Sequence, residues 1–235
     1  MTMKICLFGI TGIPLGNHNI KDARLDQVHQ WVEAQKKSYA QVVLADEKEM
    51  AVCDAILTSR AALSDLLMKD LDFVETRLGR DAGEAEKKVL TKMAEGLVSE
   101  TPVYKMGLTA EDLTAISAHS FVTSRPVVVA GEGELAAPDA LLVRALAESG
   151  YICFLTVGGK ENRAWPIRAG TTAWEAAGTV HTDMQKGFIR AEIISFADFA
   201  AAGGETQAKR AGKVRLELKT YVMQDYDVVN FRFNK

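Results

Sequence analysis

The sequence has few cysteines and no long apolar run. Its only cysteines are Cys6, Cys53 and Cys153, which lie far apart, form no CxxC pair and each sit in an apolar stretch. We therefore expect buried thiols in a reducing compartment and no metal site, because the four histidines do not cluster with them either. No apolar run reaches the roughly 18 residues that a membrane span needs, and no signal-peptide pattern is present. The sequence predicts a cytoplasmic protein without a membrane partner.

An excess of one charge is also absent from the chain as a whole. Among 235 residues, 48% are apolar and 25% are charged, and the net charge is −3. These values exclude a disordered chain and argue against indiscriminate nucleic-acid binding. The charge is unevenly placed, however. Residues 151–235 carry 12 Lys and Arg against 9 Asp and Glu, a balance of +3, whereas residues 1–150 carry 16 against 22, a balance of −6. The two signs favour two modules, with a boundary near Gly150.

The first 150 residues alternate between apolar strands and periodic helices, which favours an α/β domain. Leucines recur every three or four residues up to Leu78, and a second periodic segment follows the glycines at 79 and 83. This pattern predicts an antiparallel helical hairpin over about 53–99, beginning with one long helix over 53–78. The hairpin could bind a protein partner or pack on its own domain. Thr109 and Asp112 predict a capped helix through Ser120. The other expected elements are strands at 4–9, 41–45 and 125–130 and helices at 22–35 and from Pro138 to 149.

The last third predicts a compact α+β module. We expect strands at 151–157, 163–168, 188–194, 221–223 and 228–233, with one short helix at 172–178. Pro166 restricts its strand to a sheet edge or a bulge, since proline cannot donate to the ladder. Asp225 and Asp227 are spaced like paired catalytic carboxylates, but turn chemistry explains them as part of a hairpin between the last two strands.

The loop after the first strand nearly forms a phosphate-binding loop. The motif GxxxxGK[ST] wraps phosphates with backbone N–H groups, and its lysine and hydroxyl handle charge and Mg²⁺. Here the spacing from Gly12 to Gly16 is one residue too short, and that from Gly9 to Gly16 is two too long. Asn17 and His18 stand where lysine and Ser/Thr belong. We therefore expect an ordinary strand-to-helix turn, with a vestigial nucleotide site as the alternative; its residues would be Gly9, Gly12, Gly16, Asn17 and Glu134.

Other chemistry-bearing residues do not form a catalytic set. His119 and Ser120 are adjacent on an expected helix, and such neighbours face apart, so His119 is expected to face solvent. We expect no catalytic residue and no metal ligand. Six basic residues of the last third could contact nucleic-acid phosphates if they share one face, and otherwise are solvated charges. They are Lys160, Arg163, Arg168, Lys186, Arg190 and Arg215.

From about Leu155 onward the chain closely resembles the C-terminal part of the YchF family, the Obg-like ATPases. The resemblance is carried by residues 160–165, 167–172, 180–183, 186–192 and 224–234. It implies a TGS domain, a β-grasp module of ubiquitin-like fold, over 151–235. Weaker similarities at 22–26, 66–78 and 126–130 imply that residues 1–150 are a degenerate P-loop NTPase-like α/β domain carrying the helical hairpin. The resemblance also implies a ribosome or other RNA as partner.

This sequence departs from the family pattern at the residues that handle nucleotide. It has no phosphate-loop lysine and no Asp-x-x-Gly switch sequence after Leu44, and Gly131 replaces the asparagine of the base-reading loop, where Glu134 stands for its acidic residue. Family members are longer, and the shortfall falls between about Leu44 and Asp54. We therefore expect a binding or regulatory protein that has lost ATPase or GTPase activity and needs no cofactor. Two alternatives stay open: a protein that binds ATP or GTP with Mg²⁺ weakly, and a competitor of a full-length relative.

Overall fold

The computed structural model describes residues 2–80 and 82–234, and it divides the chain into two compact units. One unit comprises Lys4–Asn17 and Val43–Leu141, and the other comprises Met1–Met3, His18–Val42 and Leu142–Lys235. The division by compactness thus places residues 18–42 in the same unit as the C-terminal segment. A single boundary near Gly150 would instead place them with the N-terminal segment. That boundary, as a division between family modules, stays a prediction.

Three parallel strands form the centre of the first unit. Strand β1 (Met3–Phe8) pairs with β5 (Ala55–Ser59), which pairs with β6 (Val127–Ala130). The full strand order is β2-β4-β1-β5-β6, completed by β2 (Gly16–Ile20) and β4 (Ala40–Ala45). The expected helix over residues 53–62 is wrong, because Ala55–Ser59 is a buried central strand. A short apolar run flanked on both sides by other strands satisfies its backbone groups in the ladder, not in a helix.

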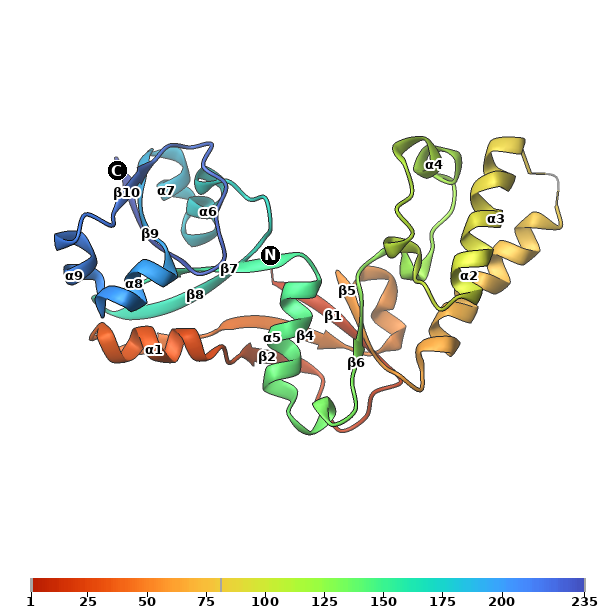
Figure 1. Cartoon of the computed structure of the whole chain (residues 1–235), viewed down its shortest axis with the longest axis horizontal. Helices are drawn as coiled ribbons and strands as arrows, with labels where there is room; N and C mark the ends of the chain where they lie inside the picture. The colour runs from red at the N-terminus through yellow and green to blue at the C-terminus, as the bar shows by residue number, and fades with distance from the viewer. Residues whose placement is uncertain (1, 81, 235) are drawn as a thin grey trace. The chain divides into compact units, whose positions relative to one another are not determined.

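The predicted helical hairpin is formed by α2 (Leu63–Leu78) and α3 (Glu84–Val98). Leu66, Val74, Leu90 and Met93 are completely buried between the two helices and the sheet, so their apolar stripes face one core. Figure 1 shows the two helices running side by side. Beyond them the unit contains α4 (Ala110–Ala115) and the 3-10 helices η1 (Glu47–Val52), η2 (Val103–Lys105), η3 (Val122–Ser124) and η4 (Glu134–Ala136). Helix α5 (Pro138–Glu148) begins in this unit, and its residues from Leu142 onward belong to the other.

The capping box of Thr109 and Asp112 is confirmed, but the helix ends at Ala115 and not at Ser120. The chain turns back beyond Ala115, and the buried carboxylate of Asp70 on α2 accepts three hydrogen bonds from η3. The donors are the backbone N–H of Val122 at 2.6 Å, the backbone N–H of Thr123 at 2.8 Å and the Thr123 hydroxyl at 2.7 Å. A buried carboxylate needs such donors, so it fixes where this segment docks.

A mixed six-stranded sheet forms the centre of the second unit, in the order β10-β9-β11-β7-β8-β3. Strands β7 and β8 are antiparallel, β11 runs parallel to β7, and β9 is antiparallel to β11. The bounds are β7 (Tyr151–Thr156), β8 (Glu161–Arg168), β9 (Phe188–Ile194), β10 (Arg215–Glu217), β11 (Asp227–Phe233) and β3 (Lys36–Ser38).

Helices cover both faces of this sheet. Figure 1 shows α6 (Ala173–Val180) on one side and α1 (Ala23–Trp31) along β8 on the other. Phe154, Ile193 and Phe231 lie in the core under α6. Buried Asn162 on β8 donates to the carbonyl of Val32, just after α1, at 2.8 Å. The remaining helices are α7 (Thr182–Lys186), α8 (Phe196–Ala202) and α9 (Glu205–Arg210).

Two details of the second unit bear on the sequence predictions. On one side of β8, Pro166 lies opposite Cys153 of β7. On the other side, β3 pairs with β8 only from Glu161 to Arg163, so among the described residues no strand pairs with that side at Pro166. This edge position is the one expected for the proline. The expected strand at 221–223 is wrong, because Val222 forms only an isolated bridge with Thr172. The last strand therefore has no hairpin partner there. Within the described residues, no helix has the length and apolar character that crossing a membrane requires.

Candidate functional site

The glycine loop after β1 does not lead into a helix. Gly16 and Asn17 already belong to β2, so the expected strand-to-helix turn is wrong. A phosphate loop depends on the backbone N–H groups of a helix N-terminus, and here the loop joins two strands. The backbone N–H of Gly9 donates instead to Glu47 Oε1 at 3.4 Å, which places a carboxylate where a phosphate would need positive potential.

The structure separates the residues of the vestigial site. Phe8 is level with Thr58, and Thr58 is level with Val129. Gly9 and Gly131 therefore both follow the carboxyl ends of parallel strands, at the same end of the sheet. Gly16 and Asn17 lie on β2, at the opposite side of the sheet from β6. Glu134, after β6, accepts from the backbone N–H of Gly131 at 2.6 Å and so closes its own loop. Gly12 is an isolated left-handed position with open space around it. Whether nucleotide binds here stays a prediction.

The six basic residues do not all lie at one end of the second sheet. Arg163 is level with Thr156 and Arg168 with Tyr151, so one β-hairpin carries them at opposite ends. Lys160 lies in the turn beside Arg163. Lys186 precedes Gly187, and the Gly187 carbonyl accepts from the backbone N–H of Asn234, just after β11. Arg190 on β9 is opposite Arg232 on β11. Because β11 runs parallel to β7, these positions belong to the same end as Thr156. Lys160, Arg163, Lys186 and Arg190 therefore lie toward one end, and Arg168 lies at the other. Arg215 pairs with Ile193, which is opposite Val229, so it is level with Thr156 and not with Arg168.

Arg215 has a structural role in the geometry. Its Nη2 donates to the Tyr221 hydroxyl at 2.9 Å and lies 3.7 Å from Asp227 Oδ1. Asp227 is 1% exposed, and it also accepts from the Tyr221 hydroxyl and from the backbone N–H of Gln224, both at 2.9 Å. Burial raises the pKa of the Asp227 carboxyl. Arg215 therefore neutralises a buried acid, and it is the least suited of the six to bind phosphate.

A cavity of about 700 Å³ opens at the end that carries the four basic residues. It lies where β11 continues past the turn between β7 and β8. Its walls are apolar through Trp165, Val229 and Phe231, and its charged lining is mixed, with Lys160 and Lys209 facing Glu161, Glu192 and Glu205. The carboxylate of Glu161 is held by the Ser38 hydroxyl and by Lys36, and these contacts lower its pKa. The lining thus carries three carboxylates against two ammonium groups, and Lys209 is paired with Glu205 at 2.6 Å.

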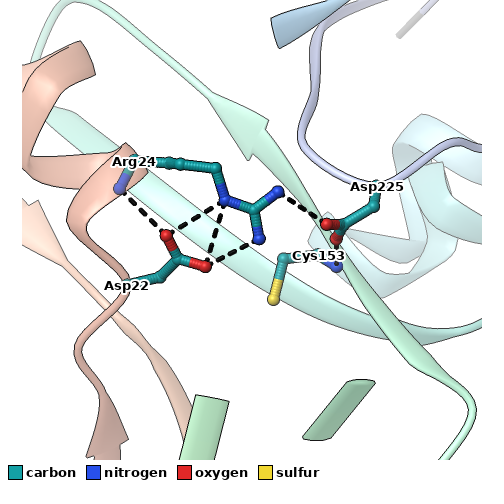
Figure 2. Close-up of polar contacts among 4 residues, drawn as sticks. All are labelled: Asp22, Arg24, Cys153 and Asp225. Carbon is teal, nitrogen blue, oxygen red and sulfur yellow. Dashed lines mark hydrogen bonds and ion pairs between the residues drawn. The ribbon is translucent and has the colours of Figure 1, made fainter. Parts of the chain in front are cut away.

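A polar cluster that includes buried Asp22 lies toward the Tyr151 end of the sheet, and sequence reasoning missed it. Figure 2 shows the guanidinium of Arg24 between two carboxylates. Its Nη2 donates to Asp22 Oδ2 and its Nη1 to Asp225 Oδ2, each at 2.7 Å. Arg24 also lies over the ring of Tyr226, with 3.6 Å between Cζ and the ring centroid. Asp225 Oδ1 accepts from the backbone N–H of Cys153 at 3.0 Å.

Asp225 and Asp227 have separate partners, and a hairpin turn does not account for them. Tyr226 between them has φ of +61°, so the chain does turn here. Each carboxylate is bound by its own cation, Asp225 by Arg24 and Asp227 by Arg215. The spacing of the two acids gave no signal for this, because both partners are distant in the sequence.

His119 differs from its expected place. It is half-buried beyond the end of α4, its Nε2 lies 2.8 Å from Glu86 Oε1, and its ring contacts Phe73 and Phe121 edge-on. The expectation that it faces solvent is wrong, because the helix that would have turned it outward ends at Ala115. The described residues contain no group of three His, Cys, Asp or Glu side chains placed to hold a metal ion. Cys6, Cys53 and Cys153 are free and buried.

Comparisons with known proteins give one consistent result. Residues 151–234 match the family model YchF-GTPase_C, described as "Protein of unknown function (DUF933)". The ribosome-binding ATPase YchF of Haemophilus influenzae is 32% identical over 233 residues, covering 73% of this chain. The YchF of Escherichia coli O157:H7 is 33% identical over the same share of the chain. The Obg-like ATPase 1 of Danio rerio is 44% identical over 98 residues, which are 40% of this chain and 25% of that protein.

The chain spans 64% of the length of the first two relatives. Among solved structures, the Schizosaccharomyces pombe YchF GTPase superposes with a TM-score of 0.73 at 18% identity, covering 98% of both chains. At that identity the similarity concerns the fold, which is a mixed α/β architecture with two sheets.

Proposed function

The chain belongs to the YchF family of Obg-like ATPases, and on that premise we propose that it is a cytoplasmic binding protein that associates with the ribosome or its RNA and does not hydrolyse nucleotide. The ribosome is taken from the names of the relatives, which are ribosome-binding ATPases. Ribosome association is the part of their activity that needs no nucleotide chemistry from this chain.

The observation that carries the loss of hydrolysis is the course of the loop after β1. The loop enters β2, its first N–H faces Glu47, and neither lysine nor a Ser/Thr hydroxyl follows Gly16. Phosphoryl transfer depends almost entirely on positioning and on positive charge at the transferring phosphate. A loop without a helix N-terminus and without a fixed cation supports binding without hydrolysis.

The strand order of the second sheet supports a β-grasp (TGS) module in the C-terminal segment. In β8-β7-β11-β9-β10, an N-terminal antiparallel hairpin is followed by a helix across one face, and the last strand pairs in parallel with the first. The four basic residues at one end of this sheet are the surface that we propose contacts the ribosome. The hairpin of α2 and α3 is a second proposed contact, with a protein partner, supported by the exposed side chains of Met68 and Val98.

Two measurements test this function. Calorimetric titration with ATP and GTP, with and without Mg²⁺, should give no tight site; a micromolar, Mg²⁺-dependent dissociation constant would instead favour nucleotide binding. Co-sedimentation with ribosomes over a salt series should show association that weakens steeply as salt rises. The double variant K186E/R190E should lose association, whereas K48E/K105E, with the same charge change at two exposed lysines of the other unit, should retain it. Equal behaviour of the two variants would remove the proposed surface.

A further inference from the structure

Three side chains at the β7–β8 turn form a continuous stack. The rings of Phe154 and Trp165 lie nearly parallel, with an interplanar angle of 12° and centroids 6.3 Å apart. Arg163 covers the ring of Trp165, with its Cζ 3.9 Å from the centroid. The indole N–H donates to the Thr156 hydroxyl at 2.9 Å, which fixes the ring in its plane. The stack therefore begins in the core, where Phe154 is completely buried, and ends at a surface guanidinium.

The outer end of the stack is accessible. The Arg163 side chain is 42% exposed, and the carboxylate that it approaches, Glu161 Oε2, is 3.9 Å away. That distance leaves the guanidinium without a short ion pair among the described residues. Arg163 is therefore held from below by an aromatic ring and open above.

Positive charge surrounds this end of the stack. Strand β3 pairs with β8 so that Lys36 is level with Glu161 and Ser38 with Arg163. Lys36 is 70% exposed with its Nζ 3.4 Å from Glu161 Oε1, and Lys160 is exposed in the turn. Two lysines and one arginine surround one carboxylate, which Ser38 also binds. Lys36 is distant in the sequence, so only the β3–β8 pairing brings it here.

We propose that this surface binds single-stranded RNA, with one base stacked on the guanidinium of Arg163 and the flanking phosphates held by Lys36 and Lys160. The inference rests on the proposed function and gives it a specific site. Unpaired bases stack on arginine planes as well as on aromatic rings, and every base has a π face, so the site is tolerant of sequence. An exposed cation alone would suit any anion, but a cation pre-stacked on a fixed indole favours a flat ligand.

The test is fluorescence anisotropy with a labelled 12-nucleotide single-stranded RNA and the full chain. Arg163→Lys keeps the charge but removes the planar surface, so affinity should fall at least about fivefold. Arg168→Lys is the matched control, because Arg168 also lies over an aromatic ring, Tyr151 at 4.8 Å, on the same strand at the opposite end. It should change affinity less than about twofold. Lys36→Gln should make the plot of log affinity against log salt less steep. The magnitude of its negative slope should fall by about 0.7, the value for one phosphate contact on a single strand.

Circular dichroism of each variant shows whether it folds, and Lys36→Gln changes a side chain that is 70% exposed. Equal affinities of R163K, R168K and the unaltered protein would overturn the stacking site, because binding would then need no planar side chain at position 163. A duplex RNA bound as tightly as the single strand would also overturn it, because paired bases hide their faces. If the unaltered protein binds the ribosome but not the oligonucleotide, this site alone is refuted. If the unaltered protein does not bind the ribosome, the proposed function is refuted.

Discussion

Arg24 Nη1 donates to Asp225 Oδ2 at 2.7 Å across a sequence separation of 201 residues (Figure 2). The same guanidinium binds Asp22, whose carboxylate also accepts from the backbone N–H of Arg24 at the start of α1. One side chain thus fastens the segment before α1 to the turn that precedes the last strand. The C-terminal sheet is consequently stabilised by residues from the beginning of the chain.

Replacing Arg24 by alanine should destabilise this unit by about 2 kcal/mol, because the largely buried carboxylate of Asp22 loses its cation and a charge-assisted hydrogen bond. The measurement is urea unfolding followed by circular dichroism. Lys209→Ala is the control, since it removes an exposed i,i+4 ion pair with Glu205 on α9 and should cost only about 0.3–0.5 kcal/mol. Equal losses would mean that the Arg24 cluster adds no more than a surface pair.

How far the sequence predicted this fold depended on whether local pattern or distant pairing decides an element. Strands such as Phe188–Ile194 and the helical hairpin followed from periodicity. Ala55–Ser59 did not, because a short apolar run beside a long helix fits either state, and its two flanking strands decide. Strand β3, Lys36–Ser38, has no apolar pattern, and only its partner β8 makes it a strand.

The candidate site shows the same limit. Residue type pointed to Lys160, Arg163 and Arg168 as members of one possible basic face, but the antiparallel hairpin places Arg163 and Arg168 at opposite ends. The missing lysine of the phosphate loop was visible in the sequence, whereas the strand that follows it was not, since Gly16–Ile20 is largely polar and lies at a sheet edge. Arg24 gave no signal at all, because its second partner is at the other end of the chain.

The free energy of unfolding should depend on pH through the Glu86 carboxyl of the helical hairpin. Arg77 first, through hydrogen bonds of 2.6 and 3.0 Å, and then His119 lower the pKa of Glu86 to about 2. A carboxyl with a depressed pKa in the folded state stabilises the protein above its unfolded pKa, near 4.3, and that contribution is lost as pH falls toward 2. Urea midpoints measured from pH 7 to pH 2 should therefore fall more steeply for the unaltered protein than for Glu86→Gln. Glu84→Gln, in the same first turn of α3, should leave the slope unchanged.

The three cysteines should resist thiol reagents while the protein is folded. Burial raises the pKa of Cys6 to about 12 and also raises the pKa values of Cys53 and Cys153. At pH 8 a thiol with a pKa of 12 is thiolate in only about one molecule in 10⁴, and the thiolate is the reactive form. Titration with a disulfide reagent should therefore detect almost no thiol in native protein and three in urea. A rapid stoichiometric reaction in the native state would show an accessible cysteine.

Gly9 is expected to be required for packing, independently of any phosphate. Its φ is +60°, and a Cβ there would lie 2.2 Å from the Cβ of Ala62, immediately before α2. Gly12, three residues later in the same loop, has φ of +88°, and a Cβ at that position would meet nothing within 4 Å. Both Gly→Ala changes force alanine into a left-handed conformation at about 1 kcal/mol, but only Gly9→Ala adds a clash between backbone-anchored atoms. Urea unfolding should show a loss of about 3 kcal/mol for Gly9→Ala and about 1 kcal/mol for Gly12→Ala. If the two variants were equally stable, the close approach of α2 would not be the reason for a glycine at the end of β1.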